Sequence, residues 1–224
     1  MTLAWAVCTV ACVLIGYFLG GIPWAVVLGR AFFKTDVRAQ GSGNSGTTNA
    51  LRAFGWWTAV AVFLLDMLKG FLPVFLAGLL TAQFSNASPT LIQTSQILAG
   101  IASVLGHMFS PYMHFTGGKG VATMSGVILG LSPWIFVAEV VIFISISLLT
   151  RYVSVASITI AVCYPIMVFV FYHSSTPMLV FSLLMAITII LMHRSNLARL
   201  RAGTENKLEL KSNGQKKPSR QEGE

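Results

Sequence analysis

The stretch that decides the fold is the apolar run at residues 3–29, LAWAVCTVACVLIGYFLGGIPWAVVLG, which contains no charged residue. A helix needs about 20 apolar residues to cross a hydrocarbon core of about 30 Å. The run is too long for the hydrophobic region of a signal peptide, and no basic segment precedes it. We therefore interpret it as the first permanent membrane span.

The composition of the whole chain agrees with a membrane protein. The chain has 224 residues, of which 55% are hydrophobic and 10% are charged, whereas a soluble domain carries about 25% charged residues. An all-α membrane protein is predicted, a polytopic helical bundle with about seven transmembrane helices. The predicted segments are 3–29, 53–80, 90–109, 120–131, 134–149, 152–172 and 176–192.

The fourth segment is short for a span. Its 12 residues rise only about 18 Å as a helix, so it either includes flanking residues or is a re-entrant element lined by protein. A five-span alternative without the fourth and fifth segments fits the hydropathy as well.

The basic residues predict an orientation. Of the 15 lysines and arginines, 14 lie in residues 30–52, 110–119, 150–151 and the segment after 192. The positive-inside rule therefore predicts an external N-terminus and a cytoplasmic C-terminus. The net charge of +8 fits this topology and attraction to anionic membrane lipids, so no nucleic-acid partner is expected. Residues 1–202 are predicted to form the membrane domain, and the polar residues 203–224 a disordered cytoplasmic tail.

A first polar segment, RAQGSGNSGTTNALR at residues 38–52, separates two apolar runs. Its glycines allow the backbone to approach a ligand closely. Thr47 or Thr48 is predicted to cap the following helix, and helix N-termini bind phosphate. Arg52 can hold two phosphate oxygens. Taken alone, the segment fits a glycine-rich turn that caps a helix equally well.

Two further polar segments follow. Residues 106–126, GHMFSPYMHFTGGKGVATMSG, surround Lys119 with glycines but do not match the Walker A pattern, so they do not predict nucleotide hydrolysis. Residues 193–208, HRSNLARLRAGTENKL, place His193, Asn196 and Arg199 on one helix face. The predicted topology puts all three segments on one side of the membrane, which favours one shared pocket. Read separately, His107 fits a packed histidine and the third segment fits a basic flank of a span.

Three charged residues lie inside apolar segments. Asp66 and Lys69 are three residues apart, and an unpaired charge in a membrane is costly, so the pair is expected to form a bridge or to face a polar interior. A structural bridge and a functional relay both remain open. Glu139 has no obvious partner. The three cysteines lie in apolar runs and are interpreted as packing residues.

Together the motifs resemble those of the bacterial acyl-phosphate-dependent glycerol-3-phosphate acyltransferases, which are integral inner-membrane enzymes. The motifs here are GSGNSGTTNALR followed by DMLKG, then GHMFSPYMHFTGGKGVAT, then HRSNLARLRAGTENKL. The resemblance covers the chain from the first span to about residue 208. Ser45 and Thr47 replace a proline and an alanine of the family pattern, and Ser110 replaces a proline. Thr116 replaces a frequent lysine, which puts one phosphate contact in doubt.

The resemblance implies transfer of an acyl chain from acyl phosphate to the sn-1 hydroxyl of glycerol 3-phosphate, giving lysophosphatidic acid and phosphate in the first step of phospholipid synthesis. It also implies a bacterial inner-membrane location with a cytoplasmic active site. The expected partners are the two substrates, membrane lipids and, as a further candidate, an enzyme that produces acyl phosphate. No cofactor and no metal are expected, because no carboxylate cluster lies beside the three segments.

The candidate site residues are assigned on this resemblance. The candidate catalytic residues are Ser42, Arg52, Lys119 and His193. The candidate substrate-binding residues are Gly43, Asn44, Thr48, Asn49, His107, Gly117, Gly118, Gly120, Asn196 and Glu205.

We expect direct transfer in a ternary complex, with Ser42 as a hydrogen-bonding group, because the chain has no Gly-x-Ser-x-Gly nucleophile motif. His193 or a substrate phosphate could act as the base. A seven-span transporter or receptor for a phosphorylated small molecule is the alternative that Asp66 and Lys69 suit, although no inverted repeat is visible. A lipid-headgroup transferase is a third possibility, but that chemistry generally needs acidic metal ligands.

Overall fold

The computed structural model describes residues 2–84 and 87–208, and in these ranges all regular secondary structure is helical. The predicted all-α class is therefore confirmed. The helices are α1 (Thr2–Gly21), α2 (Trp24–Phe33), η1 (Val37–Ala39), α3 (Thr47–Phe54), α4 (Trp56–Ala82), α5 (Pro89–Met108), η2 (Pro111–Met113), α6 (Val121–Leu131), α7 (Pro133–Thr150), α8 (Val153–Tyr172), α9 (Thr176–Met192) and α10 (Arg194–Arg201). Most of the predicted polar tail, residues 209–224, lies outside the described residues.

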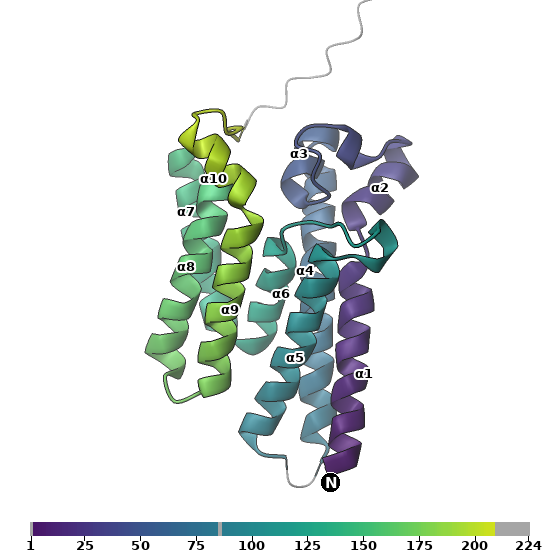
Figure 1. Cartoon of the computed structure of the whole chain (residues 1–224), viewed down its shortest axis with the longest axis vertical. Helices are drawn as coiled ribbons and strands as arrows, with labels where there is room; N and C mark the ends of the chain where they lie inside the picture. The colour runs from purple at the N-terminus through teal and green to yellow at the C-terminus, as the bar shows by residue number, and fades with distance from the viewer. Residues whose placement is uncertain (1, 85–86, 209–224) are drawn as a thin grey trace, which may run out of the picture.

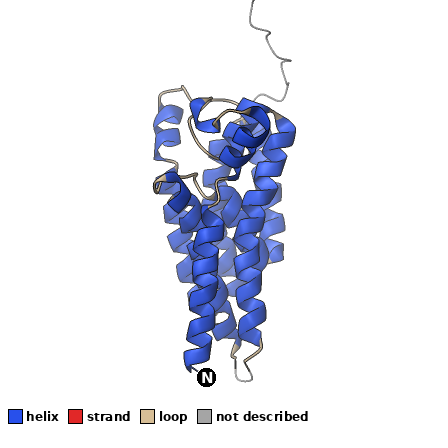
Figure 2. Cartoon of the chain, turned by 90° about the vertical axis from the view of Figure 1, so that its right-hand side faces the viewer, coloured by secondary structure: helices blue, strands red, loops and turns tan. Residues whose placement is uncertain are grey.

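The long helices form two groups, and the axes of the helices in both groups lie roughly along the length of the bundle (Figure 1, Figure 2). In the first group α1 packs on α4 and α5, and in the second α7 packs on α8 and α8 on α9. The short helix α6 lies between them and packs most closely on α4 (Figure 1). The helices of the polar segments, α3 and α10, lie at the end of the bundle opposite to the N-terminus (Figure 1).

Two of the predicted segments are interrupted. The prediction of one continuous helix at residues 3–29 was wrong, because α1 ends at Gly21 and α2 begins after Pro23. Proline has no N–H to donate and its ring clashes with the preceding turn, so it ends a helix here. The predicted segment 53–80 begins inside α3, and Gly55, at φ 84°, separates α3 from α4. The other five predicted segments agree with the structure to within one residue at each end.

Length and composition qualify four helices to cross a membrane, namely α1, α4, α7 and α8. A fifth candidate is α9 together with α10, which meet at an angle of 54°. Helix α6 has 11 residues and rises only about 17 Å, roughly half of a ~30 Å core. The predicted seven spans and their orientation therefore stay predictions.

Helix α6 is held against α4 through glycine. A Cβ atom on Gly70 of α4 would collide with the carbonyl oxygen of Thr123, and one on Gly126 of α6 would collide with the carbonyl oxygen of Met67. Membrane helices approach this closely only where small residues face each other. The contact fixes the position of α6, whose first turn directly follows Lys119.

A buried ion pair ties α4 to its neighbours. The carboxylate of Asp66 lies 2.6 Å from the ammonium of Lys69, and both side chains are 2% exposed. Lys69 Nζ donates a hydrogen bond to the carbonyl oxygen of Ile22 at the break between α1 and α2. Ser103 of α5 donates to the carbonyl oxygen of Lys69. The predicted bridge is confirmed, and its lysine gives the carbonyl oxygen of Ile22 a second donor beside the backbone N–H of Trp24.

Gly70→Ala is expected to destabilise the protein, because the added methyl group must displace the backbone of Thr123. Overpacking of this kind costs about 1–3 kcal/mol, and each kcal/mol lowers the midpoint of thermal unfolding by roughly 2–4 °C in a chain of this size. The measurement is thermal unfolding in detergent. Leu68→Phe adds more atoms on the exposed side of the same helix and is expected to leave the midpoint unchanged. Equal midpoints for Gly70→Ala and the unmodified protein would contradict the close α4–α6 contact.

Candidate active site

One cavity of about 220 Å³ collects side chains from all three polar segments. A single water needs only about 10–15 Å³, so the cavity is large enough for a small organic molecule. Its walls come from α3 and the loop before it, from the inner part of α4, from the start of α6, and from α8 and α10. The predicted convergence of the three segments on one pocket is confirmed.

Most of the candidate residues line this cavity. They are Ser42, Asn44, Thr48, Asn49, Arg52, His107, Lys119, Gly120, His193, Asn196 and Glu205. Gly43, Gly117 and Gly118 are not among the lining residues.

Asn49 shapes the first wall. Its side-chain amide nitrogen lies 2.8–3.0 Å from the carbonyl oxygens of Val37, Gln40 and Asn44, which share its two hydrogens. Its Oδ1 accepts the backbone N–H of Ser42 at 2.8 Å and lies 3.3 Å from the hydroxyl of Ser42. With its side chain occupied in this way, Asn49 holds the loop in place, and its contact with substrate stays a prediction.

The N-terminus of α3 differs from the prediction. The N-cap is Gly46, without a side-chain cap, and Thr47 is the first helical residue, so the prediction of a threonine cap was wrong. The glycine leaves the threonine side chains available for other contacts. Thr47 Oγ1 and Asn44 Oδ1 are buried and have no hydrogen-bond partner among the described residues. Buried polar atoms are normally satisfied, so these two atoms mark places where a ligand can bind.

The second wall is the loop before α6. Gly118 donates its N–H to the carbonyl oxygen of His107 at 3.2 Å. A Cβ atom on Gly117 would collide with that same carbonyl group, and one on Gly118 with the imidazole ring. These two glycines therefore allow the loop to pack on the end of α5, and His107 is the surface on which they pack. Gly120, at φ 84°, forms the N-cap of α6.

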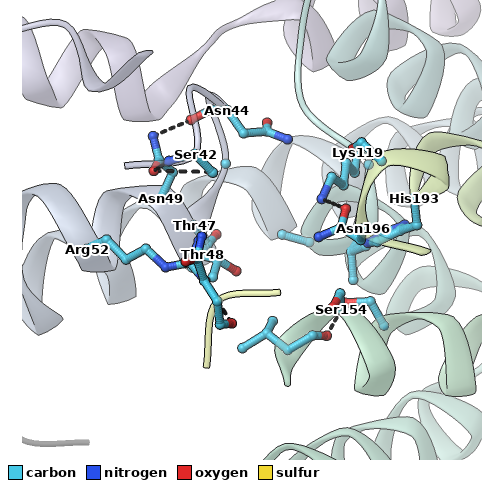
Figure 3. Close-up of a pocket in the computed structure, with 18 of the residues that line it drawn as sticks. Ser42, Asn44, Thr47, Thr48, Asn49, Arg52, Lys119, Ser154, His193 and Asn196 are labelled. Carbon is cyan, nitrogen blue, oxygen red and sulfur yellow. Dashed lines mark hydrogen bonds between the residues drawn. The ribbon is translucent and has the colours of Figure 1, made fainter. Parts of the chain in front are cut away.

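A chain of hydrogen bonds forms the third wall. Lys119 Nζ donates to Asn196 Oδ1, and Asn196 Nδ2 donates to Glu205 Oε1 at 2.6 Å. Glu205 also accepts from Arg199 Nε at 2.7 Å and from the hydroxyl of Ser154 at 2.8 Å. Because its amide nitrogen is bound to Glu205, Asn196 must present its oxygen to Lys119. Figure 3 shows Lys119, Asn196 and His193 facing the side chains of α3 across the cavity.

The electrostatics of this wall follow from its contacts. Burial alone would raise the pKa of Glu205, but hydrogen bonds from Asn196, Ser154 and Arg199 outweigh burial and lower it, so the carboxylate stays charged. Burial lowers the pKa of Lys119 to about 8; Glu205 opposes this shift, and the positive charges of Arg199 and Arg52 add to it. At neutral pH Lys119 is therefore still an ammonium group.

His193 is buried beside this wall. Its Nδ1 lies 2.8 Å from the carbonyl oxygen of Ile189. A carbonyl group can only accept, so Nδ1 carries the proton and, in the neutral ring, Nε2 is the proton acceptor. The structure thus places a fixed histidine tautomer on the cavity.

Residues 204–208 fold back over the cavity. Arg52 donates to the carbonyl oxygen of Asn206 at 3.4 Å, and the backbone N–H of Leu208 donates to the carbonyl oxygen of Arg151 at 2.6 Å. This segment therefore connects α3 with the N-terminal end of α8. The predicted domain boundary at residue 202 stays a prediction, although Glu205 contributes to the cavity of the membrane domain.

Several cavity residues were not identified from the sequence. Ser154 on α8 and the aromatic residues Phe63 and Phe143 line the cavity, but single polar or aromatic residues in apolar helices give no recognisable pattern. Asp66 also lines it, although its role was left open. The sequence signal that could have identified Asp66 as a cavity residue is its position three residues from Lys69 inside an apolar segment.

Comparisons with known proteins agree with this geometry. The family model described as Glycerol-3-phosphate acyltransferase matches residues 10–203. The glycerol-3-phosphate acyltransferase of Fusobacterium nucleatum subsp. nucleatum is 42% identical over 195 residues, which cover 87% of this chain and 95% of that protein. The corresponding enzyme of Thermoanaerobacter pseudethanolicus is 40% identical, with 87% and 93% covered.

Solved structures are similar as well. PlsY (YgiH), an integral membrane glycerol 3-phosphate acyltransferase, has been crystallised in a glycerol 3-phosphate form that is 36% identical to this chain, with a TM-score of 0.80 over 90% of this chain and 96% of that chain. Its lysophosphatidic acid form gives a TM-score of 0.77 over 90% and 95%. Sequence and structure agree over nearly the whole described chain: this protein is a multi-pass integral membrane protein that belongs to the glycerol-3-phosphate acyltransferase family.

Proposed function

We propose that the protein transfers an acyl chain from acyl phosphate to the sn-1 hydroxyl of glycerol 3-phosphate, giving lysophosphatidic acid and inorganic phosphate. The observation that carries the proposal is the pair of cations, Arg52 and Lys119, which come from different polar segments and line one cavity. Membership of the family supports the acceptor substrate and favours this activity over a transporter or receptor. The acyl-phosphate donor rests on the sequence motifs.

The two cations offset the repulsion between the phosphates of the two substrates. Both substrates carry phosphate, and two anions repel each other unless positive charge lies nearby. Arg52 can hold two phosphate oxygens through its planar guanidinium, whereas Lys119 acts as a point charge. In this proposal the two cations bring the phosphates together, and Ser42 and Asn196 contribute hydrogen bonds.

The reaction is one displacement at an activated carbonyl. The hydroxyl oxygen of glycerol 3-phosphate attacks the carbonyl carbon of acyl phosphate, and a new ester C–O bond forms. The C–O bond to phosphate breaks, and phosphate leaves with the bonding electron pair. The hydroxyl proton passes to His193 Nε2 or to a phosphate oxygen. Alignment of two bound reactants can lower a barrier by about 7–11 kcal/mol, so positioning is the main contribution of the cavity.

Two candidate binding residues act as positioning residues in this scheme. Asn49 holds the loop that carries Ser42. Glu205 fixes the amide of Asn196, which in turn orients the ammonium of Lys119. Their loss should therefore disturb the placement of the groups that touch substrate.

The proposed setting is the bacterial inner membrane, with the cavity on the cytoplasmic side. The distribution of lysine and arginine in the sequence supports this orientation. An enzyme that produces acyl phosphate is a proposed partner, because acyl phosphate is a reactive mixed anhydride. Lysophosphatidic acid, the product, is an amphiphile that can enter the membrane directly.

Activity is tested with purified protein in detergent, glycerol 3-phosphate and three donors: acyl phosphate, acyl-CoA and acyl-acyl-carrier protein. Lysophosphatidic acid should form from acyl phosphate alone, and addition of a metal chelator should not change the rate. Equal turnover of the thioesters would contradict the proposed donor. Uptake of labelled glycerol 3-phosphate into sealed vesicles without acylated product would favour a transporter.

Lys119→Ala should lower kcat/KM by about 30-fold or more, because truncating one partner of a buried hydrogen-bonded charge pair costs about 2–5 kcal/mol. Arg52→Ala, at an exposed side chain, should lower kcat/KM by about tenfold or more, because a hydrogen bond to a charged group contributes about 1.5–3 kcal/mol. Arg194→Ala is the control. Arg194 adjoins His193 in the chain, is exposed and does not line the cavity, so its removal should change kcat/KM little. Similar losses in all three variants would show that general positive charge, rather than this cavity, accounts for activity.

The pH profile should have an alkaline limb that belongs to Lys119. Its pKa of about 8 means that the ammonium is present below pH 8 and is lost as the pH rises through 8. We expect kcat/KM, which reports the free enzyme, to fall above pH 8, while kcat falls at higher pH because bound phosphate stabilises the ammonium. Lys119→Arg keeps its charge throughout and should lack this limb, whatever its absolute rate. An unchanged alkaline limb in Lys119→Arg would assign the titration to another group.

A further inference from the structure

Asp66 has a feature that the bridge to Lys69 does not explain. Its carboxylate lines the same cavity as Arg52 and Lys119, although the side chain is almost fully buried. A purely structural ion pair has no need to reach the cavity. Asp66 lies about three turns along α4 from Trp56, and α4 runs from α3 into the bundle (Figure 1), so the carboxylate belongs to the inner end of the cavity.

The carboxylate has acceptor capacity to spare. An ionised carboxylate offers about four acceptor sites. Lys69 Nζ lies 2.6 Å from Oδ1, and His107 Nδ1 lies 3.8 Å from the same oxygen, which is too far for a hydrogen bond. Among the residues that the structure describes, Oδ1 is buried and has no hydrogen-bond partner of good geometry, although Lys69 Nζ lies close to it. Buried acceptors are normally satisfied, so a donor from a ligand would complete this site.

Charge decides which part of a ligand can lie there. A carboxylate repels phosphate, which the cations Arg52 and Lys119 attract instead. A carboxylate accepts hydrogen bonds from hydroxyl groups. The ammonium of Lys69 neutralises Asp66, so the pair can accept a hydrogen bond without placing a net negative charge beside the two phosphates.

From these contacts we propose that Asp66 determines specificity for the acceptor, by accepting a hydrogen bond from the C2 hydroxyl of glycerol 3-phosphate. The inference rests on the proposed function and assigns a residue to one part of that substrate. The phosphate is held at the cations, the C2 hydroxyl at Asp66, and the reacting C1 hydroxyl is thereby fixed in direction. Lys69 is a positioning residue that holds the carboxylate in place through its bond to Ile22.

The first test uses the unmodified protein and three acceptors. Glycerol 3-phosphate has a C2 hydroxyl, dihydroxyacetone phosphate has a C2 carbonyl that cannot donate, and 3-hydroxypropyl phosphate has no polar group at C2. All three carry a primary hydroxyl for acylation. A hydrogen bond to a charged group contributes about 10- to 100-fold, so kcat/KM should be lower by that factor for both analogues. Equal kcat/KM for 3-hydroxypropyl phosphate and glycerol 3-phosphate would overturn the proposal.

The second test uses Asp66→Asn. An amide can donate to a carbonyl, so the preference for glycerol 3-phosphate over dihydroxyacetone phosphate should shrink tenfold or more, even if absolute rates fall. Because an unpaired Lys69 would destabilise the fold, the double variant Asp66→Asn/Lys69→Met is measured in parallel. If Asp66 had only a structural role, its replacement would lower kcat/KM for all three acceptors by the same factor and leave their ratios unchanged. That result would also overturn the proposal.

Asp36→Asn is the matched control. Asp36 pairs with Arg30 and Arg38 at 2.9 and 2.8 Å and does not line the cavity, so the same chemical change there should leave the acceptor ratios as they are.

Failure of the proposed function is distinguishable from failure of this inference. If the unmodified protein acylates none of the acceptors, the proposed function fails; if it acylates all of them equally well, only the role of Asp66 fails.

Discussion

The hydrogen-bonded chain from Lys119 through Asn196 to Glu205 is the interaction on which the site depends. Lys119 precedes α6, which packs on α4 of the first helix group, whereas Asn196 lies on α10 and Ser154, the further partner of Glu205, on α8. The chain therefore joins the two groups across the cavity. Without it, the ammonium of Lys119 would be a partly buried charge with no fixed direction.

The packing of the helices also fixes the position of Lys119. Gly70 and Gly126 let α6 approach α4 so closely that a methyl group on either would meet a backbone carbonyl. The ion pair of Asp66 and Lys69 then fastens α4 to the break between α1 and α2. Polar groups are costly inside a membrane; here Asp66 and Lys69 pair with each other, Lys69 joins two helices and Asp66 faces the cavity.

Much of this could be predicted from the sequence. The apolar runs predicted the helices, because a helix that crosses a bilayer needs a long segment with few charges. The three polar segments stood out against that background, and their convergence followed from the asymmetric placement of lysine and arginine. Short apolar helices such as α6 left the number of spans open, since hydropathy does not distinguish a full span from a protein-lined element.

Pro23 and Gly55 interrupt predicted helices, and both are local signals that the predicted segments did not take into account. Other features depend on tertiary contacts that no local pattern records. Gly117 and Gly118 were expected to bind substrate, which stays a prediction, and their lack of side chains lets them pack against His107. Ser154 is an isolated serine in an apolar helix, and only the fold brings it to Glu205. Asn49 was assigned to substrate, which stays a prediction, and its five hydrogen-bonding contacts join α3 to the segment that precedes it.

The central claim is that Arg52 and Lys119 hold phosphate jointly in one cavity between the helix groups. The most direct measurement is a crystal structure of this protein with glycerol 3-phosphate bound. The phosphate is expected within hydrogen-bonding distance of both the guanidinium of Arg52 and the ammonium of Lys119. A phosphate bound outside this cavity, or in contact with neither cation, would contradict the account.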